Sequence, residues 1–150
     1  MKAEVLTQKE KELIAVGAAV SGGCVKCSNY HFKQAIEQGA SKDEVHQAVM
    51  AATTVIESSV EILQRTAYSL MNIERQVVTV RDIETSEPLT ALIKLASAVA
   101  ANNVANVKRY IGIADELGSS SSEINLTIRL ARVIQKRAGK FVDEAIAEVL

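Results

Sequence analysis

Both cysteines of the chain and one of its two histidines lie in one short segment, Cys24-Val25-Lys26-Cys27-Ser28-Asn29-Tyr30-His31. Cys24, Cys27 and His31 stand at positions i, i+3 and i+7, which share one face of an α-helix. Two thiols one turn apart can form a disulfide, because one thiol can be oxidised while the other resolves it. A histidine one turn beyond Cys27 could take its proton. The segment therefore predicts a thiol redox site.

The surroundings of this segment favour reactive thiols. Cys24 directly follows a Gly-Gly pair, and a helix that starts there would stabilise a thiolate through its unpaired N–H groups and its dipole. Lys26 adds positive charge if its side chain points toward the thiols. Glu12 lies on the preceding predicted helix, and a hairpin at the two glycines could return its carboxylate toward His31. A carboxylate that orients a histidine is typical of nucleophile relays.

Composition favours a small helical protein. The chain has 150 residues, is 48% hydrophobic, and contains one Pro, three Tyr, two Phe and no Trp, which is typical of one domain of packed helices. The net charge of −1 and the scarcity of aromatic residues give no reason to expect nucleic acid. We expect neither a membrane span nor a signal segment, and therefore a cytoplasmic protein. In that compartment, two closely spaced cysteines are redox-active or metal-binding more often than structural.

The second half of the sequence repeats the first after a shift of 79 residues, which brings Cys24 onto Asn103. Two unrelated helical segments would share apolar positions, but not their glycines and helix-cap residues, so we infer an internal repeat. The matched pairs include Leu13/Leu92, Ala19/Ala98, Gly39/Gly118, Ser41/Ser120 and Glu44/Glu123. We expect a single all-α domain over residues 1–150, with tandem three-helix repeats at about 5–75 and about 85–150.

Helix signals define three helices in each repeat. Thr7 with Glu10, and Ser41 with Glu44, have capping-box spacing and open the first and third helices. Beyond the third helix, Val77–Glu84 reads as a linker in which Val77–Val80 could form a short strand. The remaining expected bounds are a first helix ending near Val20, a second from near Cys24 to Gly39, and second-repeat helices at Glu87–Ala101, Asn103–Leu117 and Ser121 to the C-terminus, with a possible interruption at Gly139.

The repeats differ where the first repeat carries its reactive residues. The chemistry-bearing side chains are absent from the second copy, which we interpret as a degenerate partner that keeps the packing. Asparagine at both cysteine positions suggests a polar or partly wet pocket rather than an apolar core. The exchanges from the first repeat to the second are Cys24 to Asn103, Cys27 to Asn106, His31 to Tyr110 and Glu12 to Ala91.

The residue types and their spacing also allow other interpretations of the cysteines. The cysteines could be buried apolar filler, or they could bind zinc together with His31 and Glu12. A thioredoxin-type fold is disfavoured because no βαβ pattern surrounds the motif. His46, in the exposed capping turn of the third helix, is expected at the surface. A basic cluster in the last predicted helix suits a helix C-terminus or a solvated face; it consists of Lys136, Arg137 and Lys140.

The Glu…Cys-x-x-Cys-x-x-x-His pattern, with Cys24 twelve residues after Glu12, resembles the alkylhydroperoxidase AhpD-like group of the carboxymuconolactone decarboxylase family. The similarity covers about residues 7–65, and the degenerate second copy extends it. The resemblance implies an AhpD-like all-α fold and a homo-oligomer, either a trimer or a hexamer. The peroxidase of that family has a histidine between its cysteines, where this chain has Lys26.

The resemblance also implies site roles. Cys27 would attack the hydroperoxide, Cys24 would be the more exposed resolving thiol, and Glu12 with His31 would form a proton relay. This thiol peroxidase or disulfide oxidoreductase would need no metal or organic cofactor. Its partners would be a hydroperoxide or disulfide substrate and an unidentified thiol reductant, the role that a lipoylated protein fills for the family's peroxidase. The alternative is a non-redox decarboxylase-like enzyme, or an oligomeric binding protein of the same fold.

Overall fold

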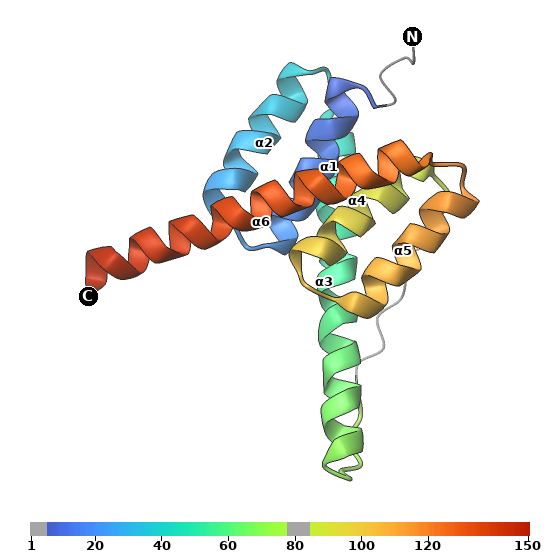
Figure 1. The fold of residues 1–150 in the computed structure, drawn as a ribbon, viewed down its shortest axis with the longest axis vertical. Coiled ribbons are helices and arrows are strands. Elements are labelled where there is room, and N and C mark those ends of the chain that lie inside the picture. The colour runs from blue at the N-terminus through green and yellow to red at the C-terminus, as the bar shows by residue number, and fades with distance from the viewer. Residues whose placement is uncertain (1–5, 78–84) are drawn as a thin grey trace.

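The computed structural model describes residues 6–77 and 85–150 (Figure 1). In these residues it is all-α, with six helices and no strand. The first three helices have 14, 13 and 29 residues and the last three have 13, 13 and 29. The predicted all-α fold of two three-helix repeats is therefore confirmed. The helices are α1 (Gln8–Ser21), α2 (Val25–Glu37), α3 (Lys42–Leu70), α4 (Pro88–Ala100), α5 (Val104–Glu116) and α6 (Ser121–Val149).

Helix starts follow the capping signals in the first repeat. Both predicted capping boxes are present, one with Thr7 at the start of α1 and one with Ser41 at the start of α3. The second repeat differs at its first helix, where the N-cap is Glu87 and makes no side-chain cap bond. Pro88 follows in the first turn, where its missing N–H has no intrahelical partner to lose.

Two expectations, an interruption of the last helix at Gly139 and a short strand at Val77–Val80, are not seen in the described residues. α6 continues through Gly139 without interruption, because a single glycine costs a helix only about 1 kcal/mol. The possible strand at Val77–Val80 lies outside the described residues except for Val77, which has no regular structure. The expected single domain and its repeat bounds stay predictions.

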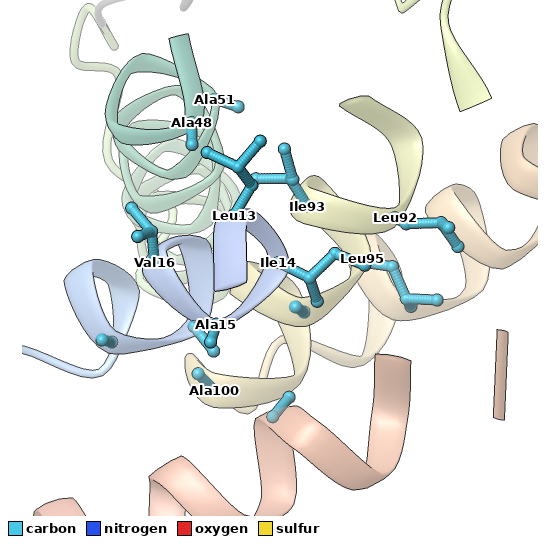
Figure 2. Packing of buried hydrophobic residues seen from close by; sticks show 14 of the residues in the cluster. Leu13, Ile14, Ala15, Val16, Ala48, Ala51, Leu92, Ile93, Leu95 and Ala100 are labelled. Carbon is cyan, nitrogen blue, oxygen red and sulfur yellow. The ribbon is translucent and has the colours of Figure 1, made fainter. Parts of the chain in front are cut away.

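α1 and α4 form the centre of the molecule. Consecutive residues of each are buried on all sides, from Glu12 to Ala19 in α1 and from Ala91 to Ala100 in α4, as expected for helices enclosed by others. Both pack against α3 and α6, while α2 lies against α1 and α5 against α4. Figure 2 shows Leu13 of α1 between α3 and Ile93 of α4. The central pair therefore supports the helices that carry the site.

α1 and α4 approach one another closely at Gly17. A Cβ at this position would lie 2.7 Å from Cγ2 and 2.9 Å from the carbonyl oxygen of Ile93. Near the end of α1, the Ser21 hydroxyl donates a 2.7 Å hydrogen bond to the Ser97 carbonyl of α4. The end of α1, from which the chain turns toward the cysteines, is thus fixed on the second repeat.

The C-terminal halves of the two long helices extend away from this body (Figure 1). The apolar periodicity of α3 is buried only in its first half, since Val60 is 49% and Leu63 is 65% exposed. On α6, Val142 and Ile146 are also more than half exposed. None of the described helices is long and apolar enough to span a membrane.

Candidate active site

The cysteine pair forms the start of α2. Cys24 is its N-cap residue, and its Sγ accepts a 3.2 Å hydrogen bond from the backbone N–H of Cys27. Gly23 has φ +68° and turns the chain between α1 and α2, a conformation that costs glycine little. Cys24 and Cys27 form a disulfide, with their Cα atoms 5.3 Å apart. The predicted helix start and the proximity of the two sulfur atoms are thus both present.

Glu12 of α1 reaches His31 of α2. The His31 Nδ1 lies 2.7 Å from the Glu12 Oε2, and each side chain is 11% exposed. The Gln8 amide donates to the other carboxylate oxygen of Glu12 at 3.2 Å. Because Nδ1 is engaged by the carboxylate, Nε2 is the ring nitrogen left for proton exchange. The structure brings Glu12 and His31 together, as we expected from a hairpin at the two glycines. In the sequence alone, Glu12 looks like an ordinary solvent-exposed charge on a helix.

Each cysteine lines a separate surface cavity. Cys24 lines one of about 670 Å³ between the α1–α2 turn and α6. Cys27 and His31 line a second of about 390 Å³ between α2 and α6. Lys26 and Phe141 line both cavities, and the Lys26 Nζ lies 4.6 Å from the centre of the Phe141 ring. Cys24 and Cys27 therefore line different cavities, which share the contact between Lys26 and Phe141.

Burial does not distinguish the two cysteines in this disulfide form. Cys24 is 6% and Cys27 is 5% exposed, so the greater exposure implied for Cys24 is not seen. Both belong to the buried core cluster, yet both line cavities that open to the surface. Apolar filler would have no need of these openings.

Three residues of α6 complete the smaller cavity, and the sequence did not place them near the cysteines. Arg137, Lys140 and Phe141 line it opposite Cys27. The basic cluster is not at a helix end, because α6 runs on to Val149. Lys136, Arg137 and Lys140 are exposed, as expected for a solvated face. Only the spacing of these residues, at i, i+3 and i+4 on one helix face, could have grouped them. Nothing in the sequence indicates that this face covers Cys27.

The residues at the equivalent positions of the second repeat make contacts of their own. Asn103 caps α5 by accepting a 2.9 Å bond from the N–H of Asn106. Asn106 is 2% exposed, and its amide nitrogen lies 3.4 Å from the hydroxyls of Ser58 and Ser59 of α3. Tyr110, in the position of His31, is fully buried. The surroundings of Asn106 are therefore polar, as one part of the expectation had it, and its amide group is paired within the protein.

Two other expectations concern metal binding and the second histidine. Within residues 6–77 and 85–150, no three His, Cys, Asp or Glu side chains are grouped so that they could hold a metal ion. The zinc interpretation therefore gains no support from the geometry. His46 is exposed on the first turns of α3, as expected.

The cysteine pair, Glu12 and His31 all lie in the segment of the chain that is similar to a known family. The family model described as the carboxymuconolactone decarboxylase family matches residues 1–64, which include α1, α2 and most of α3. A search of curated proteins finds no match. Residues 1–64 of this chain are therefore similar to the carboxymuconolactone decarboxylase family.

Proposed function

We propose that this protein is a thiol-dependent peroxidase of the alkylhydroperoxidase AhpD-like type. The observation that carries the proposal is the disulfide-bonded pair at the start of α2, with Cys27 in one cavity beside His31 and with the Nδ1 of His31 2.7 Å from the buried Glu12. The similarity of residues 1–64 to the carboxymuconolactone decarboxylase family is compatible with this activity. A dithiol of this kind needs no metal or organic cofactor.

In the proposed reaction, His31 takes the proton of the Cys27 thiol while Glu12 stabilises the charged ring. The thiolate attacks the terminal oxygen of the hydroperoxide, so an S–O bond forms, the O–O bond breaks, and the alkoxide leaves and takes a proton to become an alcohol. The Cys24 thiolate then attacks the Cys27 sulfenic sulfur, and the S–S bond forms as hydroxide leaves and is protonated to water. Two electrons pass from the dithiol to one hydroperoxide.

A dithiol reductant must then restore the enzyme. Its thiolate attacks one sulfur of the Cys24–Cys27 disulfide, its second thiol resolves the mixed disulfide, and the reductant leaves oxidised. We assign this role to a thiol reductant protein, and we include a cytoplasmic location in the proposal because thiols are kept reduced there.

Trapping of the sulfenic acid tests the assignment of the two sulfur atoms. Reduced Cys24→Ser, treated with one equivalent of cumene hydroperoxide and dimedone, should carry a dimedone adduct on Cys27, found by peptide mass spectrometry. Cys27→Ser should react slowly, and Asn103→Ser should behave as the wild type, because it alters only the matching cap in the second repeat. Absence of the adduct in Cys24→Ser would contradict the peroxidase proposal and favour a non-redox enzyme or binding protein of this fold.

We also propose that the chain forms a homo-oligomer, with a trimer expected first and a hexamer as the alternative. The support is the apolar surface on the extended halves of α3 and α6, which includes Leu63, 65% exposed, and Val142, 58% exposed. Such surface is typical of protein–protein contacts. Light scattering of the purified protein should give three or six chain masses, and a monomer would contradict the assignment.

A further inference from the structure

The cavity over Cys27 has a wall of positive charge. Lys26 of α2, with Arg137 and Lys140 of α6, line it, and none of the residues lining it is acidic. The whole chain carries a net charge of −1, so this concentration of cations does not follow from a generally basic protein. A cationic wall around a cavity favours the entry of an anion.

These cations are only weakly neutralised by their neighbours. Arg137 has no hydrogen bond or ion pair within the described part of the chain. Lys140 lies 4.0 Å from Glu144, and both side chains are largely exposed, at 75% and 49%, so this pair contributes little. The carboxylate of Glu12 is already engaged by His31.

The rest of the cavity is suited to an organic body rather than to a bare inorganic ion. Phe141 and Tyr30 contribute aromatic surface, and Lys26 packs its ammonium over the Phe141 ring. A volume of about 390 Å³ is in the range of small-molecule sites. The cavity thus combines an apolar wall, a cationic wall and a redox-active sulfur.

Comparison of the two repeats shows that this arrangement of charge is not inherent in the scaffold. α3 of the first repeat has Ser58 and Glu61 where α6 of the second has Arg137 and Lys140. Lys26 of the first repeat is replaced by Ala105 in the second. At these three positions the cations occur only around Cys27, whereas the equivalent site has Arg109 in the place of Tyr30.

We propose that the Cys27 cavity binds organic hydroperoxides that carry a carboxylate, with Arg137 and Lys140 as the carboxylate-binding residues. This inference rests on the proposed peroxidase function and names its substrate class. The reaction would convert such a hydroperoxide into the corresponding hydroxy acid and water, while the dithiol becomes the disulfide. Arg137 can bind a carboxylate with two parallel hydrogen bonds, and Lys140 adds a second charge one turn away.

The charge preference can be measured without a peroxide. The reduced protein is mixed with 5,5′-dithiobis(2-nitrobenzoate), a disulfide with two carboxylates, or with the uncharged 4,4′-dithiodipyridine, and both rates are followed by absorbance. The ratio of the two rate constants cancels any change in thiolate reactivity. We expect this ratio to fall by about 10-fold or more in Arg137→Ala/Lys140→Ala, to recover partly in Arg137→Lys/Lys140→Ala, and to change little in Lys136→Ala, which removes a neighbouring charge outside this cavity.

A second pair of probes extends the test to hydroperoxides. The hydroperoxide of linoleic acid should oxidise the reduced wild type faster than its methyl ester does, and the double variant should lose this preference. An unchanged disulfide ratio in the double variant would overturn the carboxylate assignment and leave the peroxidase proposal intact. Slow oxidation by both hydroperoxides, with rapid reaction of both disulfides, would instead contradict the peroxidase proposal. A disulfide ratio lowered equally by Lys136→Ala would overturn the assignment in favour of a general surface field.

Discussion

The two repeats of this protein share one helical frame and differ in what it holds. At the start of α2 the Cys24 sulfur accepts a bond from the N–H of Cys27, and at the start of α5 the Asn103 oxygen accepts the same bond from Asn106. The first place opens into cavities, whereas Asn106 is buried against serines of α3. The cap and the packing therefore do not require cysteine, and the cysteines are explained better by chemistry than by structure.

The largest expected difference between the repeats is in activity. Cys27→Ser should lower peroxide turnover by at least about 10³-fold, because it removes the attacking thiolate. Asn106→Ala, the matched change in the second repeat, should leave turnover near the wild-type value and lower the free energy of unfolding by about 1–2 kcal/mol, because it removes buried hydrogen bonds. Turnover assays and urea unfolding measure the two effects. Equal losses of turnover in both variants would refute the division of roles between the repeats.

The Glu12–His31 contact is the next difference, since the second repeat has Ala91 and Tyr110 in its place. Glu12→Gln keeps the size of the side chain but removes its charge, and should slow the reaction with hydroperoxide by about 10²-fold. The pH profile of Cys27 alkylation by iodoacetamide should shift as well, which a purely structural role would not produce. His46→Gln is the control, because His46 is exposed on α3. A normal rate and pH profile in Glu12→Gln would exclude the relay.

Stability should respond at the contact between the repeats. Gly17→Ala places a methyl group against Ile93 of α4, and we expect a loss of about 2 kcal/mol in the free energy of unfolding. Gly112→Ala in α5 meets nothing within 4 Å and should stabilise by about 0.5–1 kcal/mol through the unfolded chain. Thermal and urea unfolding would compare the two variants. An unchanged free energy of unfolding in Gly17→Ala would contradict this prediction and show that α1 and α4 can move apart slightly without loss of stability.

The smallest difference concerns the capping boxes of α3 and α6. The backbone N–H of Ser41, and then the Lys9 ammonium at 3.0 Å, lower the pKa of Glu44 from its ordinary value of 4.5. The stabilisation of the native state by ionised Glu44 is fully present above pH 4.5. It is lost as the pH falls through the lower pKa that Glu44 has in the native state. Glu44→Gln should therefore lower Tm by about 2 °C at pH 7, and by less in acid.

Glu123→Gln is the matched control for this ion pair. Glu123 occupies the same position in the α6 capping box, but Pro88 stands where the first repeat has Lys9. Its substitution should change Tm less than Glu44→Gln does, and added salt should reduce the gap. Equal shifts in the two variants at low salt would show that the Lys9 contact contributes nothing.

Much of the fold could be predicted because its signals are local. Capping residues defined the starts of α1 and α3, and the repeat predicted the second set of helices. The extended half of α3 could not be predicted, because periodicity describes a face without saying what covers it. Leu63 fits the apolar face by spacing and is nevertheless 65% exposed.

The candidate site divides in the same way. The cysteines and His31 share one short segment, so their proximity followed from helical spacing. The contact of Glu12 with His31 depends on how α1 and α2 pack. The sequence indicated only that a hairpin at the two glycines could bring them together. The approach of Arg137 and Lys140 to Cys27 joins segments more than 100 residues apart, and no local pattern encodes it.

The most direct test of this account is the second-order rate constant for reaction of the reduced wild-type protein with cumene hydroperoxide, followed by loss of free thiols and compared with glutathione at the same pH. The account predicts a rate constant at least about 10²-fold above that of glutathione, with one Cys24–Cys27 disulfide formed per hydroperoxide consumed. A rate constant equal to that of glutathione would contradict it.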